Sequence, residues 1–188
     1  MNKIVLYLLL CLALVSCITT AGCLGYFDFH ESSVELLSSD SSVFLFEGKV
    51  THVGDGDTIT VELSDKTRER IRLIGIDTPE MDASQNSARE YGSLSQDHLA
   101  EWAKKAKDFT TEQLLYDTVT ISYDPAAGER DRYDRVLGYV TSDGRDFNQV
   151  LIEEGYARVY IAETFDRKQD YIDALETAQK YKIGMWNE

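Results

Sequence analysis

The chain has no cysteine beyond residue 23. All three cysteines of the 188-residue sequence, Cys11, Cys17 and Cys23, lie within its first 23 residues. The rest of the chain therefore has no disulfide bond, no thiolate nucleophile and no cysteine ligand for a metal ion. A domain built from it must be held together by its hydrophobic core alone.

The sequence also lacks an excess of basic residues. Nineteen Lys and Arg stand against 33 Asp and Glu, which gives a net charge of −14 at pH 7. Nucleic-acid-binding proteins are usually basic, because their cations neutralise phosphates. Charge alone therefore argues against a nucleic-acid partner, and a phosphate would have to be bound by a local group of cations within an acidic surface.

The hydrophobic run at the N-terminus is too short to suggest a membrane span in the mature protein. It reads MNKIVLYLLLCLALVSC, with one Lys, an apolar stretch and then small residues, as in a secretory signal. Leu14–Cys17 and Thr20–Cys23 both resemble the lipobox of bacterial and archaeal lipoproteins, in which the cysteine is lipidated. We predict a signal peptide over residues 1–23, cleaved before Cys17 or Cys23, and a lipoprotein held at the membrane of the cell surface. Ordinary secretion and an uncleaved anchor helix are the alternatives.

The remainder of the sequence divides into a tether and one domain. Residues 24–45 are rich in Ser and acidic residues, and we interpret them as a tether. A flexible chain of about 20 residues spans roughly 25 Å, which is enough to lift a small domain off a membrane surface. Residues 46–188 contain no internal repeat and are long enough for a single hydrophobic core, so we expect one monomeric domain there.

Short β-rich runs dominate the first half of this domain, and helical spacing dominates its end. Three runs separated by Gly/Asp and Ser/Asp turns indicate a β-meander. We expect strands at 46–53, 58–63, 68–76, 118–123, 136–141 and, briefly, 157–161, with helices at 99–115, 147–154 and 168–182. An α+β, mainly β fold with a five-stranded OB-type barrel and about three helices fits this order.

Two carboxylates are expected to meet at one end of the meander. Asp57 follows the turn Asp55-Gly56 at the start of the second strand, and Asp77 ends the third. Carboxylates brought together repel unless one is protonated or a cation lies between them. No His or Cys is close in the sequence, so hard oxygen ligands for Ca²⁺ or Mg²⁺ are indicated. The alternative is that these aspartates only form turns.

Three further residues carry potential chemistry. Arg72 lies on a strand that otherwise looks buried and needs a partner, which is either a nearby aspartate or a phosphate bound by its guanidinium fork. Arg135 stands directly before the strand expected at 136–141, where a lone arginine would usually be solvated. Glu80, three residues beyond Asp77, either orients a water molecule or opens a solvent loop.

Four segments resemble the staphylococcal nuclease family in order and spacing: HVGDGDTITV, RLIGIDTPE, DRYDRVLGYV and the terminal GMW. The resemblance covers about residues 47–187. It implies a calcium-dependent nuclease, a phosphodiester hydrolase whose substrate is DNA alone or both DNA and RNA. It also implies that Asp57, Asp77 and the backbone carbonyl of Thr78 bind Ca²⁺, that Arg72 and Arg135 contact the scissile phosphate, and that Glu80 is the candidate general base.

Other substrate contacts are less specific. Tyr133 and Tyr160 are placed to stack on bases, and Arg132 to contact a further phosphate, although most of the 11 tyrosines of the chain are expected to pack. The sequence departs from the family pattern in a longer loop after Glu80. It also has Asp134 where glycine is common, which either weakens phosphate binding or points outward.

The main alternative to an enzyme is a binding module. Degenerate relatives of this fold hold nucleic acid or peptide without cleaving it, and they lose the arginines or the metal-binding carboxylates. All five residues of the predicted centre are present in this chain: Asp57, Arg72, Asp77, Glu80 and Arg135. Their retention favours the nuclease over a binding module, and over a structural domain without a ligand.

Overall fold

The computed structural model describes residues 45–87 and 89–188. The predicted signal peptide, nearly all of the tether, and both candidate lipidation sites, Cys17 and Cys23, lie outside these residues. Leu45, assigned to the tether from the sequence, is the first residue of strand β1. No helix within the described ranges combines the length and apolar character needed to cross a membrane.

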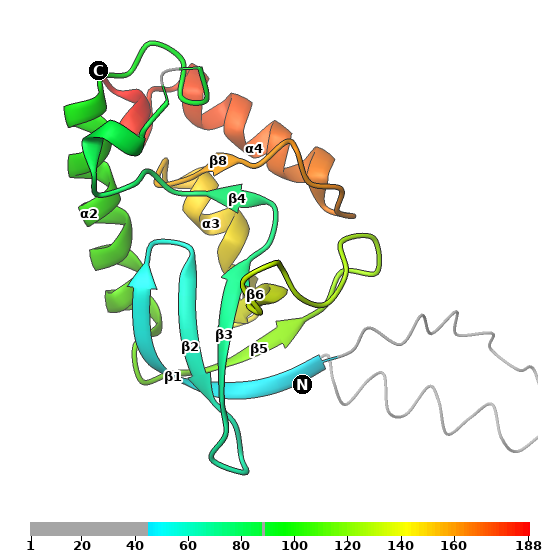
Figure 1. The fold of residues 1–188 in the computed structure, drawn as a ribbon. Helices are drawn as coiled ribbons and strands as arrows, with labels where there is room; N and C mark the ends of the chain where they lie inside the picture. Colours follow the sequence, from blue (N-terminus) through cyan, green and yellow to red (C-terminus); the bar gives the residue numbers. More distant parts are fainter. Residues whose placement is uncertain (1–44, 88) are drawn as a thin grey trace, which may run out of the picture. The chain divides into compact units, whose positions relative to one another are not determined.

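A closed barrel forms the centre of the domain (Figure 1). Strands β1 (Leu45–Asp55), β2 (Thr58–Glu62) and β3 (Arg68–Leu73) form the predicted antiparallel meander. On its other edge β1 pairs with β5 (Thr118–Ser122), and β5 pairs with β6 (Val136–Ser142). Parallel pairing of β6 with β3 closes the barrel. The five-stranded barrel predicted from the sequence is therefore confirmed.

The barrel interior is filled by aliphatic side chains at alternate strand positions. This alternation places every second residue inside, where β-branched side chains pack well. Val50, Ile59, Val61, Ile71, Ile121 and Val140 are all fully buried. Since the described residues include no disulfide-forming cysteine, burial of this apolar surface is the main source of the domain's stability.

The third predicted strand is interrupted, and this break positions the candidate site. β3 ends at Leu73, and Gly75 takes a left-handed backbone with a φ of 76°. The ring of Phe165 packs where a Cβ on Gly75 would lie, at 2.6 Å, so only glycine fits. The chain then continues as β4 (Ile76–Asp77), which leaves the barrel and pairs with β8 (Arg158–Val159).

Three α-helices in the described part of the chain cover the barrel, as predicted. Helix α2 (Gln96–Leu114) follows the cap residue Ser95 and begins three residues before the start expected from its apolar stripe. It buries Leu99, Ala103, Ala106 and Leu114. Helices α3 (Phe147–Glu153) and α4 (Lys168–Lys180) follow the predicted ranges closely. The short elements are β7 (Arg145–Asp146) and the 3-10 turns η1 (Ala83–Gln85) and η2 (Gly184–Trp186).

Candidate active site

One cavity of about 530 Å³ collects every described residue that the sequence singled out. It lies where the β1–β2 turn, β4 with the loop after it, and the loop before β6 meet. The predicted residues that line it are Asp57, Arg72, Asp77, Thr78, Glu80, Arg132, Tyr133, Arg135 and Tyr160. Residues about a hundred positions apart in sequence therefore face the same hollow.

The β1–β2 turn is fixed from three sides. Asp55 Oδ1 accepts a hydrogen bond from the backbone N–H of Asp57, at 3.2 Å, as an Asx turn does. A Cβ on Gly56 would lie 2.7 Å from Thr78 and 2.8 Å from Ala106, so this close approach requires glycine. Thr110 of α2 donates its hydroxyl to the Gly56 carbonyl at 2.8 Å. Helix α2 thus holds the turn that presents Asp57.

The Asp57 carboxylate is buried, with 5% of the residue exposed, and is well supplied with donors. Its Oδ2 accepts from the backbone N–H of Thr78 at 2.9 Å, and its Oδ1 accepts from the Thr58 hydroxyl at 3.2 Å. The first of these bonds ties the β1–β2 turn to the end of β4, as the predicted convergence of the two strand ends requires.

Arg72 joins the two aspartates. One guanidinium nitrogen lies 3.0 Å from Asp57 Oδ2, and another lies 3.3 Å from Asp77 Oδ1. Burial of the guanidinium acts to lower the pKa of Arg72, but the charges of Asp57 and Asp77 raise it overall. Arg72 therefore stays charged, and it pairs with both nearby aspartates at once.

Asp77 has two further partners that the sequence did not reveal. Arg158, its register partner on β8, contacts Asp77 Oδ2 at 2.6 Å, and the Tyr91 hydroxyl donates to the same oxygen at 3.2 Å. Burial raises the pKa of Asp77, while Arg158 acts to lower it. Nothing in the sequence near β4 indicates Arg158, because β4 pairs with a strand about 80 residues away only after it has left the barrel.

Glu80 is placed by its backbone. Asn86, which is only 3% exposed, accepts from the Glu80 N–H at 2.8 Å and donates to the Glu80 carbonyl at 2.8 Å. The Glu80 side chain itself is exposed on the cavity wall. Burial and the charges of Asp57 and Asp77 raise its pKa, although Arg72 and Arg135 oppose the shift. The loop after Glu80, longer than the family pattern, thus includes the residue that fixes it.

Arg135 also lines the cavity. Its Nε donates to Asp131 Oδ2 at 2.7 Å, and its Nη1 donates to the Thr58 hydroxyl at 3.4 Å. Asp134, the departure from the family pattern, has a φ of 62°, which explains why glycine suits that position. Its side chain is 88% exposed and lies 3.6 Å from Arg130, so it points outward. The acid that affects Arg135 directly is Asp131.

The aromatic residues differ in exposure. Tyr133 is 60% exposed, and the Arg132 guanidinium lies 4.7 Å from its ring centroid while also donating to its hydroxyl at 2.7 Å. Tyr160 is half-buried, its N–H donates to the Gly75 carbonyl at 2.9 Å, and Arg158 lies 5.7 Å from its ring. Both rings are therefore held beside cations at the rim of the cavity.

The donor set suits a hard divalent cation. The described residues include no cluster of three or more His, Cys, Asp or Glu side chains arranged as a complete metal site. The cavity instead offers oxygen atoms from two paired aspartates and has no His or Cys in its wall. Burial, together with the charge of Asp57, raises the pKa of Asp55 to about 6. This concentration of negative charge is what a bound cation would relieve.

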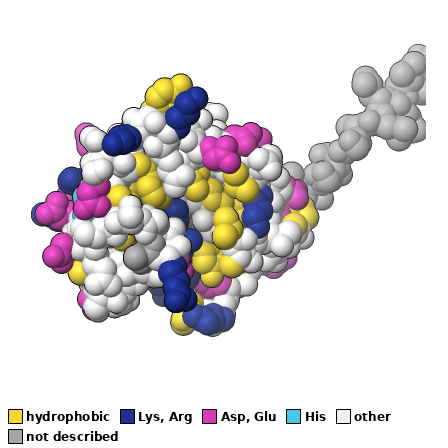
Figure 2. All heavy atoms as spheres, turned by 90° about the horizontal axis from the view of Figure 1, so that it is seen from above, with side chains coloured by type: hydrophobic (Ala, Val, Ile, Leu, Met, Phe, Trp, Pro, Cys, Tyr) yellow, Lys and Arg dark blue, Asp and Glu magenta, His cyan; other side chains and the backbone are white. Residues whose placement is uncertain are grey.

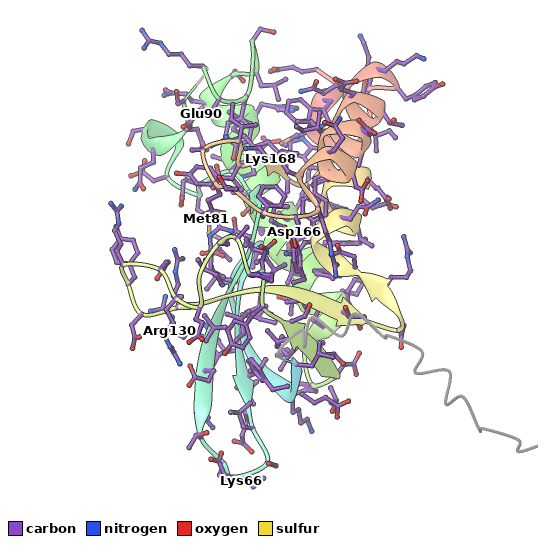
Figure 3. The ribbon with its side chains drawn as sticks, turned by 90° about the vertical axis from the view of Figure 1, so that its right-hand side faces the viewer. Lys66, Met81, Glu90, Arg130, Asp166 and Lys168 are labelled. Carbon is purple, nitrogen blue, oxygen red and sulfur yellow. The ribbon has the colours of Figure 1, made fainter. Side chains whose placement is uncertain are left out.

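The surface around the cavity is mixed in character. Figure 2 looks onto the side on which β4, β8 and α4 lie, and it shows hydrophobic side chains next to Lys and Arg in the middle of this face. In Figure 3, Met81 lies between Glu90 and Arg130, and Lys66 lies at the far end of the barrel. Met81 is 50% exposed. Cations, apolar groups and acidic side chains are therefore all present on this face.

Comparison with known proteins extends these observations. Residues 70–188 match the family model described as staphylococcal nuclease homologue. An uncharacterized protein of Methanocaldococcus jannaschii is 37% identical over 151 residues, which cover 76% of this chain and 72% of that protein. The thermonuclease of Staphylococcus hyicus is 36% identical over 140 residues, covering 74% and 75%. Endonuclease YhcR of Bacillus subtilis is 32% identical over 154 residues, which cover 76% of this chain but 12% of that longer protein.

Proposed function

The chain belongs to the staphylococcal nuclease family and is a phosphodiester-hydrolysing nuclease. We propose that it cleaves nucleic acid, either DNA alone or both DNA and RNA, in a calcium-dependent reaction at the cavity described above. The observation that carries the proposal is the pairing of Asp57 and Asp77 through Arg72, at 3.0 and 3.3 Å, with Glu80 and Arg135 on the walls of the same cavity.

Asp57, Asp77 and the backbone carbonyl of Thr78 are the proposed ligands of the calcium ion. Ca²⁺ takes oxygen ligands from carboxylates, carbonyls and water, and these residues offer such donors at one corner of the cavity. When bound there, the ion supplies positive charge to the phosphate oxygens and to a coordinated water. Asp55, which lines the same corner, contributes further negative charge.

The two arginines are proposed to bind the scissile phosphate. Hydrolysis places additional negative charge on the phosphate oxygens, and preorganised guanidinium groups stabilise that charge. Arg72 and Arg135 are each held by a carboxylate, Arg72 by Asp57 and Arg135 by Asp131, so their orientation is set before the substrate binds. Fixed donors of this kind need little reorganisation during the reaction.

Glu80 is proposed to take the proton from the attacking water. A general base works best when its pKa lies close to the working pH, and burial together with the neighbouring aspartates raises the pKa of Glu80 above its ordinary value. The two hydrogen bonds from Asn86 to its backbone fix the point from which the side chain reaches into the cavity.

Cleavage of denatured DNA by the full chain, with Ca²⁺ and then with a chelator, tests this proposal. We expect cleavage with Ca²⁺ and none with the chelator. Replacing Glu80 by Gln, or Arg135 by Ala, is expected to lower kcat by at least about 100-fold, since general bases and charge-stabilising donors contribute factors of this size.

Arg130→Ala is the matched control for Arg135→Ala. Arg130 lies in the same loop, 38% of its side chain is exposed, it pairs with Glu69, and it does not line the cavity. Its loss is expected to change kcat less than twofold. Metal-independent cleavage, or equal activity of Arg135→Ala and Arg130→Ala, would contradict the assignment. Binding of DNA without any cleavage would favour a non-catalytic binding module.

Export and membrane attachment are a further part of the proposal, supported by the signal-like N-terminal sequence with its two lipobox-like segments. In an expressing cell, the full chain is expected in the membrane fraction, labelled by a radioactive fatty acid. Loss of the label in either Cys17→Ala or Cys23→Ala identifies the modified cysteine. Labelling retained in the double variant would contradict lipidation.

A further inference from the structure

A second cavity of about 390 Å³ adjoins the catalytic one, between β8, α4 and η2. Its wall is formed by Arg89, Glu90, Arg158, Val159, Tyr160, Ile161, Ala162, Leu175, Gln179 and Trp186. This volume is sufficient for a small organic group, and aromatic and aliphatic walls with a few polar atoms are typical of ligand sites. A flat ring with polar edges, such as a nucleobase, matches such a wall.

The two cavities are separated by one short segment. Tyr160 and Ala162 line both of them. The Lys168 ammonium group donates to the carbonyls of Ile161 and Glu163, at 2.6 and 2.7 Å, and so fixes this segment from the side of α4. Ile161 is 66% exposed at the rim. The two cavities therefore share part of one wall, formed by Tyr160 and Ala162.

Two residues of the second cavity's wall each carry a buried side-chain nitrogen without a hydrogen-bond partner. Among the described residues, the only buried side-chain nitrogen or oxygen atoms without a partner are Arg158 Nε and Trp186 Nε1, and both belong to residues of this wall. The Arg158 side chain is only 8% exposed, and its Nη2 is occupied by Asp77 and Glu90. Buried donors without acceptors are unfavourable and rare.

We infer that this second cavity binds the unpaired base of a nucleotide that flanks the scissile phosphate. The inference rests on the proposed nuclease function and extends it. The phosphate lies between Arg72 and Arg135, the sugar-phosphate backbone passes over Tyr160, and the flanking base packs against Leu175 and the Trp186 indole. A base that remains paired and stacked in a duplex cannot enter, so the strand must be locally unpaired at this position.

The test uses single-stranded oligonucleotides of equal length and charge, each with one cleavable linkage and one abasic position within two nucleotides of it. With the full chain and Ca²⁺, removal of the base that occupies the second cavity is expected to lower kcat/KM about tenfold, as expected for one lost stacking contact. The number of phosphates is the same throughout, so the electrostatic contribution does not change.

Gln179→Trp fills the cavity from the exposed face of α4, and Thr177→Trp is its matched control. Both positions are exposed on the same helix, but Thr177 does not line the cavity. The tenfold penalty at the sensitive abasic position is expected to disappear in Gln179→Trp and to remain in Thr177→Trp. If Gln179→Trp leaves the penalty unchanged at every abasic position, or if both variants behave alike, the inference is overturned.

A binding measurement separates this inference from the nuclease proposal. The same oligonucleotides are titrated into the Glu80→Gln variant in Ca²⁺, and the dissociation constants are measured by calorimetry. A tenfold weaker affinity for one abasic strand, removed by adding Gln179→Trp, supports the base site even if no strand is ever cleaved. Equal affinities for all strands overturn it, whereas absence of cleavage by the unmodified chain contradicts only the nuclease proposal.

Discussion

Asn86 is the residue whose contribution to the site is most easily separated from folding. The two hydrogen bonds of its side chain, both 2.8 Å, go only to the backbone of Glu80, and it does not line the catalytic cavity. We predict that Asn86→Ala lowers kcat about tenfold and changes KM less than twofold, because the base is displaced while the phosphate contacts stay. Steady-state kinetics on a single-stranded substrate measures both constants.

Gln85→Ala provides the comparison for Asn86→Ala. Gln85 is the preceding residue, and its side chain bonds to Asp82 on the exposed side of the loop. Its replacement is expected to leave kcat unchanged. An equal loss of kcat in both variants, or a rise in KM without a fall in kcat for Asn86→Ala, would show that the loop as a whole, rather than the Glu80 backbone, is affected.

Asp55 gives the metal-free protein a characteristic pH dependence. Burial and the neighbouring Asp57 raise the pKa of Asp55 from 3.8 to about 6. Between these values the folded chain binds more protons on Asp55 than the unfolded chain does, so the free energy of unfolding decreases as the pH rises. We predict that Asp55→Asn removes part of this decrease. Urea unfolding in chelator at pH 4, 5, 6 and 7 measures it.

Calcium provides an internal check on the Asp55 prediction. A cation at the corner formed by Asp55, Asp57 and Asp77 favours the ionised carboxylates, so the difference between wild type and Asp55→Asn over this pH range should shrink when Ca²⁺ is present. A wild-type unfolding free energy that rises from pH 4 to pH 6 in chelator, in parallel with that of Asp55→Asn, would contradict the assignment.

For single residues, the sequence predicts those site residues that stand out from their immediate neighbours in the chain. Arg72 is an arginine on an apolar strand, and Asp77 follows that strand directly, so both are conspicuous. Arg158, Tyr91 and Asn86 are not conspicuous, because a buried arginine, a tyrosine and an asparagine each have many structural uses. Their contacts with Asp77 and Glu80 depend on chain segments that are distant in sequence or lie in an irregular loop.

Among the elements, the turn after α3 packs closely against the segment before η2. Gly155 has a φ of 72°, and a Cβ there would lie 2.3 Å from the Ile183 carbonyl oxygen. Gly144, in the turn between β6 and β7, has a φ of 74° but no atom within 4 Å of its Cβ position. The two glycines therefore share a backbone conformation and differ in available space.

We predict that Gly144→Ala destabilises the fold by about 1–2 kcal/mol, the strain of a left-handed residue alone. Gly155→Ala is expected to cost about 3 kcal/mol or more, because the backbone of the segment before η2 must also move. Urea unfolding of both variants measures the difference. Equal losses would show that the contact between Gly155 and the C-terminal segment, which includes the hydrogen bond from Met185 N–H to the Gly155 carbonyl, is unimportant for stability.

The sequence predicted the existence and type of these elements better than their ends. Period-two alternation and turn residues locate the barrel strands, because both are local properties of the chain. The division of the predicted strand at 68–76 into β3 and β4 is set instead by Phe165, which packs against Gly75 from 90 residues away. A tertiary contact of this kind leaves no local pattern, although a glycine inside an apolar run marks the position where a break is possible.

For the molecule as a whole, the acidic charge and the small cationic cavity have opposite effects on a nucleic acid. A net charge of −14 repels a polyanion, while Arg72, Arg135 and Arg132 attract it at one place. Screening limits the range of the distant charges to about 8–10 Å near physiological salt. The acidic surface should therefore lower affinity and slow association, without preventing phosphate binding in the cavity.

This combination predicts a shallow salt dependence. Each phosphate neutralised on a single strand contributes about −0.7 to the slope of log(kcat/KM) against log[salt], so about three cations give a slope close to −2. Arg132→Ala is expected to reduce its magnitude by about 0.7, because the residue is proposed to contact a phosphate. Lys66→Ala should leave the slope unchanged, since Lys66 lies at the opposite end of the barrel (Figure 3) and its side chain is 81% exposed. A wild-type slope of about −5 or steeper would instead require a long basic contact surface, which an acidic exterior with cations gathered at one cavity does not provide.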